Sequence, residues 1–164
     1  MISSGTYNPD EIGPKTNIDE VVTGQPGTLP VANKEAIRMT ALMGLALNCQ
    51  IDEFSKFDRK HYFYPDLPMG YQITQFYQPI IRGGEVAITL DGQPKIIRIH
   101  EAHLEADAGK ITHPAGKDYS LVDLNRAGTP LLEIVSEHDI NSPAEAQIYA
   151  KELYLLMRYA EVSD

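Results

Sequence analysis

The chain has 164 residues, 43% of them apolar, which suits one domain or one domain with a short arm. Its net charge of −9 argues against generic nucleic-acid binding through a large basic face. No stretch approaches the roughly 18 apolar residues of a membrane span, and the N-terminus lacks the features of a secretory signal. The single cysteine, Cys49, excludes an internal disulfide and a cysteine-built zinc site. We therefore expect a cytoplasmic protein with no membrane partner.

The first half of the chain predicts a helix and a β-hairpin. Residues 1–20 are polar and without period, and they predict an arm or loop. Residues 33–48 begin with an asparagine suited to an N-cap and have helical apolar spacing. Residues 85–90 and 95–100 have strand-like patterns, and the Asp-Gly pair at 91–92 is a strong hairpin signal.

The second half predicts short strands and a long helix. Residues 119–122 and 131–135 have the content of short strands. Residues 142–159 open with a Ser-Pro-Ala-Glu capping box and continue as an amphipathic helix. This order of elements predicts an α+β fold, with a largely antiparallel sheet and flanking helices.

The most informative segment is residues 56–68, KFDRKHYFYPDLP, in which charged residues lead into aromatic residues and proline. Basic groups beside stackable rings suit a ligand with phosphates and bases, such as the end of a nucleic acid. This interpretation makes Lys56, Arg59 and Tyr64 candidate contacts to such a ligand. The alternative is a solvated turn that leads into a buried aromatic strand.

Acidic residues collect after the predicted hairpin. Strand alternation would place His103, Glu105 and Asp107 on one face, where carboxylate oxygens could bind a hard divalent cation. The alternative is a solvent-facing edge of the sheet. Glu133 lies inside an apolar run, so it must be paired, ligated or turned outward on a half-buried strand.

Arg126 is a further candidate site residue, whereas the sequence offers neither a nucleophile nor a phosphate-binding loop. Arg126 precedes a Gly-Thr-Pro turn, where its guanidinium could either lock a loop or contact a phosphate. Ser120 has no histidine and acid in a recognisable order, so the sequence predicts no nucleophile. The Gly-Gly pair at residues 83–84 is too short for a phosphate-binding loop.

Several motifs, in the same order, resemble the B subunit of the tRNA-dependent aspartyl/glutamyl amidotransferase. They are residues 26–31 (PGTLPV), 56–68, 70–73 (GYQI), 103–110 (HLEADAGK) and 120–137 (SLVDLNRAGTPLLEIVSE). The resemblance implies that residues 21–164 form part of the catalytic cradle domain of that family. The family's opening strand, with its Gly-Leu-Glu-Val-His motif, has no match, so we expect a truncated fragment of this domain.

The resemblance implies ATP-dependent transamidation of misacylated Glu-tRNA(Gln) or Asp-tRNA(Asn). In that reaction Mg-ATP phosphorylates the side-chain carboxylate, and ammonia from a partner amidase attacks the acyl phosphate. The implied cofactor is Mg²⁺, and the implied partners are the amidase (A) subunit, the small C subunit and the tRNA acceptor end. The alternative is a non-catalytic fragment or scaffold that binds partner subunits or tRNA without turnover.

The resemblance also implies roles for individual residues. Lys60 corresponds to a lysine that lines the family's inner cavity, and Glu105 and Glu133 match glutamates that hold magnesium. These three are the candidate catalytic residues, and we expect His103 to complete the metal ligands with the two glutamates. The family usually has a second glutamate, associated with ammonia passage, where this chain has Ala106.

Overall fold

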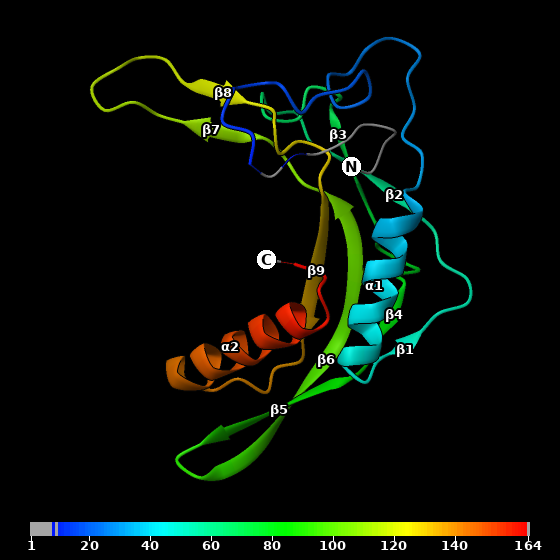
Figure 1. Ribbon diagram of the computed structural model, residues 1–164, viewed down its shortest axis with the longest axis vertical. Helices are drawn as coiled ribbons and strands as arrows, with labels where there is room; N and C mark the ends of the chain where they lie inside the picture. The colour runs from blue at the N-terminus through cyan, green and yellow to red at the C-terminus, as the bar shows by residue number, and fades with distance from the viewer. Residues whose placement is uncertain (1–7, 9, 164) are drawn as a thin grey trace. The chain divides into compact units, whose positions relative to one another are not determined.

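The computed structural model describes residue 8 and residues 10–163, so part of the arm predicted over residues 1–20 lies outside the described residues. Its elements in chain order are α1 (Lys34–Ala46), β1 (Gln50–Ile51), β2 (Asp58–His61), β3 (Tyr71–Thr74), β4 (Ile81–Arg82), β5 (Glu85–Leu90), β6 (Gln93–Ala106), β7 (Lys110–Thr112), β8 (Leu121–Asp123), β9 (Pro130–Ser136) and α2 (Pro143–Tyr159). The strand pairs of defined register are antiparallel. The predicted α+β class with antiparallel pairing is confirmed (Figure 1).

The chain divides into two units, and most of the larger sheet belongs to the unit of residues 37–56, 76–104 and 132–164. Its strands follow the order β1–β4–β6–β5, and β9 also pairs with β6. The predicted hairpin is confirmed, since β5 and β6 pair from Glu85↔Arg98 to Leu90↔Gln93. Asp91 and Gly92 have φ values of 50° and 76°, the positive values that a two-residue hairpin turn of type I′ requires.

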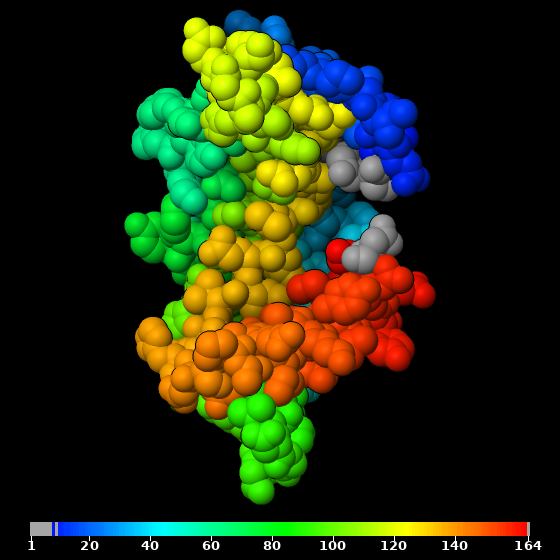
Figure 2. All heavy atoms as spheres, turned by 90° about the vertical axis from the view of Figure 1, so that its left-hand side faces the viewer, coloured from blue at the N-terminus to red at the C-terminus, as the bar shows by residue number. Residues whose placement is uncertain are grey.

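Strand alternation builds the core of this unit. One face of the hairpin is buried and packs against both helices, and the buried members of this core are Met43, Leu47, Val86, Ile88, Ile97, Ile99 and Tyr149. The outer surface of α2 and the hairpin tip beyond it are visible in Figure 2. Cys49 packs against the same core, and burial raises the pKa of its thiol to about 11. That shift disfavours the thiolate, as expected for an inert cysteine.

Both helices begin where their sequence signals predict. The Asn33 side chain accepts a hydrogen bond from the backbone N–H of Glu35 at 2.9 Å. The Ser142 hydroxyl accepts one from the backbone N–H of Glu145 at 3.2 Å, and Pro143 is the first helical residue. Among the described residues, neither helix is long and apolar enough to cross a membrane.

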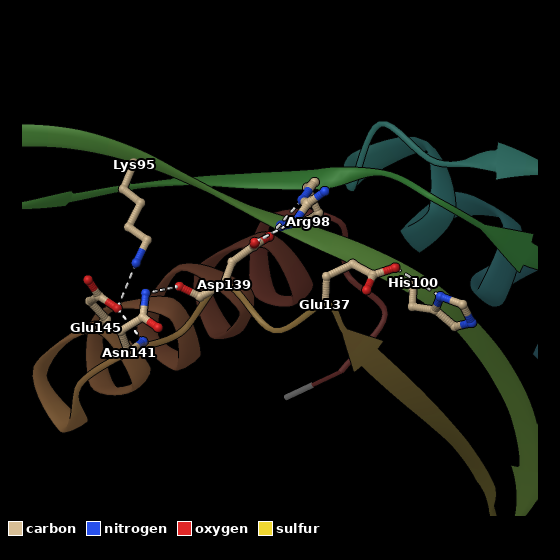
Figure 3. A network of polar contacts seen from close by, with 7 residues as sticks. All are labelled: Lys95, Arg98, His100, Glu137, Asp139, Asn141 and Glu145. Atoms are coloured by element: carbon tan, nitrogen blue, oxygen red, sulfur yellow. Dashed lines mark hydrogen bonds and ion pairs between the residues drawn. The ribbon is translucent and has the colours of Figure 1, made fainter.

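A polar network joins β6 to the loop before α2 (Figure 3). Arg98 donates to both carboxylate oxygens of Asp139, from Nε at 2.9 Å and from Nη2 at 2.7 Å. These bonds and one from the Arg98 backbone N–H lower the pKa of Asp139 to about 2. Lys95 makes a further ion pair with Glu145 at 2.8 Å. Charge-assisted bonds therefore hold the start of α2 against the hairpin.

The other unit comprises residues up to 36 together with 57–75 and 105–131, and it contains the β2–β3 and β7–β8 ladders. Its described N-terminal part has turns but neither helix nor strand through residue 20. Asn125 holds this segment, because its Oδ1 accepts from the backbone N–H of Thr16 and of Asn17 at 2.7 and 3.0 Å. Its Nδ2 also donates to the Gly13 carbonyl at 2.6 Å.

Candidate active site

The β2–β3 ladder decides where two neighbouring basic residues point. Lys60 lies directly opposite Gln72, and Arg59 lies opposite Ile73. Residues directly opposite one another share a face of the ladder, and successive residues alternate between faces. Lys60 therefore projects from the face of Gln72, and Arg59 projects from the opposite face.

A buried glutamate is bound to the Gln72 face. Glu105, near the end of β6, is 5% exposed. Gln72 Nε2 donates to Glu105 Oε1 at 3.1 Å and to the Ala106 carbonyl at 2.9 Å. Thr74 Oγ1 donates to Glu105 Oε2 at 3.0 Å. The structure therefore brings the Glu105 carboxylate to the face of the ladder from which Lys60 projects.

In the other unit, buried His103 lies between two acidic side chains. Its Nδ1 is 3.4 Å from Glu101 Oε1, and its Nε2 is 3.9 Å from Glu133 Oε2. The Glu133 side chain is 52% exposed, so it both approaches the imidazole and faces outward. Glu105 follows two residues after His103 on β6. Because His103 and Glu105 are both buried, the alternative of a solvent-facing sheet edge is wrong for them.

The chemistry of these side chains fits a divalent cation. Glu105 accepts hydrogen bonds from Gln72 and Thr74 on different oxygens of its carboxylate. The carboxylates of Glu105 and Glu133 are ligands that Mg²⁺ and Mn²⁺ accept, and the His103 imidazole adds a nitrogen ligand. Each of these side chains is therefore of a kind that binds a divalent cation.

Arg126 locks a loop, which was one of the two roles predicted for it. Its Nε donates to the Ala108 carbonyl and its Nη2 to the Gly109 carbonyl, each at 3.0 Å. Nε also lies 3.2 Å from Asp107 Oδ2. Burial raises the pKa of the Asp107 carboxyl, and Arg126 offsets part of that rise. Since β6 ends at Ala106, Asp107 belongs to this loop and not to the strand. Contact of Arg126 with a phosphate stays a prediction.

Two other predicted basic contacts, Arg59 and Lys56, each lie over an aromatic ring. The Arg59 guanidinium is 5.1 Å from the ring centroid of Tyr71, a cation–π contact on the face opposite Lys60. Lys56 belongs to the other unit, where its Nζ is 5.4 Å from the Tyr77 ring centroid. On β2 itself, Arg59 and Lys60 therefore project from opposite faces.

The aromatic part of the segment is exposed. Phe63 is 82% exposed and Tyr64 is 58% exposed, and a surface hollow is lined by Tyr62, Phe63 and Tyr64. The His61 and Phe63 rings stack with their centroids 5.6 Å apart. The alternative of a buried aromatic strand is therefore wrong for Phe63 and Tyr64. Both rings are therefore exposed to solvent, although the Phe63 ring also stacks on His61.

Sequence reasoning missed three polar side-chain contacts. Gln72 and Thr74 were not singled out, although polar residues inside a short, otherwise apolar strand are a usable signal. A third contact joins His113 Nδ1 to Ser120 Oγ at 2.7 Å, so Ser120 does have a histidine beside it. Both of these side chains are exposed, and the contact fastens the β7–β8 hairpin loop.

Comparison with known proteins gives consistent matches. The family described as GatB/GatE catalytic domain matches residues 2–164. The chain is 52% identical over 157 residues to the B subunit of the aspartyl/glutamyl-tRNA(Asn/Gln) amidotransferase of Pseudothermotoga lettingae, covering 93% of this chain and 33% of that protein. The B subunit of the Moorella thermoacetica amidotransferase is 50% identical over 153 residues, covering 92% and 32%. The chain therefore spans about one third of the length of these curated relatives.

Proposed function

The chain belongs to the GatB/GatE catalytic domain family, and from this premise we propose that it carries the carboxylate-activating site of a tRNA-dependent amidotransferase. The substrates are ATP, ammonia and misacylated Glu-tRNA(Gln) or Asp-tRNA(Asn). A carboxylate is a poor electrophile, so its oxygen first attacks the γ-phosphate of ATP and releases ADP. Ammonia then attacks the acyl carbon, phosphate leaves, and the side chain becomes an amide.

The residues of this chain supply positioning and charge. The Lys60 ammonium acts as a point charge that attracts the γ-phosphate or the aminoacyl carboxylate. Glu105, held by β3, contributes a fixed carboxylate together with His103 and Glu133. These three residues are the ones that would hold a magnesium ion, which would supply positive charge to offset the charge of the triphosphate.

One observation carries this proposal: Lys60 and the donors to Glu105 share a face of the β2–β3 ladder. A cation and a buried carboxylate presented on one face suit a substrate that combines phosphate with metal. The exposed rings of Phe63 and Tyr64 support the further proposal that terminal bases of the tRNA stack there. The amidase (A) subunit and the small C subunit are the proposed partners.

The competing proposal is a scaffold that binds partner subunits without turnover, and Ala106 is the observation that favours it. The two proposals differ in nucleotide binding, so Mg-ATP titrated into the purified chain in a calorimeter separates them. An active-site domain binds Mg-ATP, and Lys60→Ala weakens that binding. Binding of the partner subunits with no binding of Mg-ATP would overturn the catalytic proposal.

A further inference from the structure

Strand β3 presents two polar side chains to a buried carboxylate, and the reaction proposed above gives neither of them a role. We propose that Gln72 and Thr74 are positioning residues that fix the Glu105 carboxylate for binding of a divalent cation. This inference rests on the proposed function, in which Glu105 is a metal ligand.

The two hydrogen bonds from β3 reach different oxygens of the Glu105 carboxylate. Glu105 Oε1 accepts from Gln72 at 3.1 Å, and Oε2 accepts from Thr74 at 3.0 Å. Gln72 is 6% exposed and Thr74 is 1% exposed, so water competes little for either bond. Because these two donors reach different oxygens, a small rotation of the carboxylate about its last bond would weaken both hydrogen bonds at once. The plane of the Glu105 carboxylate is therefore held by β3.

The amide of Gln72 also has one defined orientation. Its nitrogen lies 3.1 Å from a carboxylate oxygen and 2.9 Å from the Ala106 carbonyl oxygen. Both of these atoms are acceptors, so the amide atom between them must be the donor nitrogen. Gln72 thereby ties the Glu105 side chain to the backbone of the strand that carries it.

These donors suit a carboxylate that must keep its charge for another ligand. A buried carboxylate needs hydrogen-bond donors, and Gln72 and Thr74 provide them without adding a formal positive charge beside it. Partners of this kind orient the groups that bind metals, and their loss typically costs about 10- to 100-fold in metal affinity. Gln72 and Thr74 are therefore expected to act on metal binding through Glu105.

The test measures Mn²⁺ affinity of the purified protein by calorimetry, and its melting temperature without metal. Thr74→Val removes the hydroxyl but keeps the shape, Thr74→Ser keeps a hydroxyl, and Gln72→Met removes the amide. Ile73→Val is the matched control, because Ile73 is buried on the same strand but alternates to the opposite face. We expect Thr74→Val and Gln72→Met each to weaken Mn²⁺ binding about 10-fold or more. Thr74→Ser should keep the Mn²⁺ affinity of the parent protein. Ile73→Val should lower the melting temperature and leave the Mn²⁺ affinity unchanged.

A double variant shows whether the effect passes through the carboxylate. In a Glu105→Gln background, adding Thr74→Val should cause no further loss of affinity, because coupled residues are not additive. Wild-type affinity in both Thr74→Val and Gln72→Met, with Mn²⁺ bound by the parent protein, would overturn this inference alone. Absence of Mn²⁺ binding by the parent protein would overturn the proposed metal site and this inference with it.

Discussion

Alanine substitutions of two adjacent basic residues on β2 should have different effects, one on Mg-ATP binding and the other on stability. Lys60 projects from the face of Gln72, whereas Arg59 projects from the other face and lies over the Tyr71 ring. Lys60→Ala should weaken Mg-ATP binding and leave the fold intact. Arg59→Ala should lower stability and leave Mg-ATP binding unchanged. The two variants are each other's control, since they remove the same formal charge from neighbouring positions.

The expected magnitudes follow from the surroundings of each cation. Lys60 is exposed, so its removal should change the free energy of unfolding by no more than about 0.5 kcal/mol. Arg59 loses an exposed cation–π contact worth about 0.5–1 kcal/mol. An ammonium about 4 Å from a phosphate charge gains about 1 kcal/mol in water and about 4 kcal/mol at an effective dielectric constant of 20. For exposed Lys60 we expect about 1–2 kcal/mol, which is a 5- to 30-fold loss of affinity.

Urea unfolding gives the stability change, and calorimetric titration with Mg-ATP gives the affinity. The same pair of variants in an assembled amidotransferase would report the rate of Gln-tRNA(Gln) formation. Equal loss of Mg-ATP affinity in Lys60→Ala and Arg59→Ala would refute this reasoning. It would show that the affinity depends on the charge of these residues and not on the strand face from which they project. An unchanged affinity in Lys60→Ala would remove Lys60 from the site.

The purified chain alone should not convert Glu-tRNA(Gln) to Gln-tRNA(Gln) with ammonium as donor, and appreciable turnover would refute this. The pKa of Asp139 falls from 3.8 to about 2 on folding, so its pairing with Arg98 stabilises the fold above about pH 4 and is lost toward pH 2. The urea concentration at the midpoint of unfolding should therefore fall less between about pH 4 and pH 2 in Asp139→Asn than in the parent protein. Ala106→Glu should lower the melting temperature, because Ala106 is 1% exposed and overpacking such a site costs about 1–3 kcal/mol. Burial of the new carboxylate adds a desolvation cost. Cys49, with a pKa of about 11, should react far more slowly with a thiol reagent at pH 7.5 in the folded protein than in urea, and equal rates would contradict its burial.

Local signals were sufficient for the main elements of the fold. Asn33 and Ser142 cap their helices through backbone groups only a few residues away, and the Asp91-Gly92 turn needs only its own two dihedral angles. Such features depend on short-range chemistry, so they were predictable without tertiary information. The ordered motifs likewise pointed to the family, because several motifs in one order are more specific than any single short motif.

The surroundings of the candidate site depend on contacts between distant residues. Gln72 and Thr74 reach Glu105 across 33 and 31 positions of sequence, and no local pattern specifies that pairing. Arg59 and Lys60 are adjacent basic residues, and the sequence does not show which of them is the site residue. Only the register of β2 against β3 decides that Lys60, and not Arg59, shares the face of Gln72. That register could not be predicted, because β2 is charged and mostly exposed and has no apolar alternation to define its inner face.

The sequence by itself therefore determined the fold class, the helix starts, the hairpin and the family. The tertiary structure decided which side chains act together, including the burial of Glu105 and the exposure of Phe63. The physical reason is the range of the interactions. Caps and turns are satisfied within a few residues, whereas the environment of a buried carboxylate is made by whichever strands pack around it.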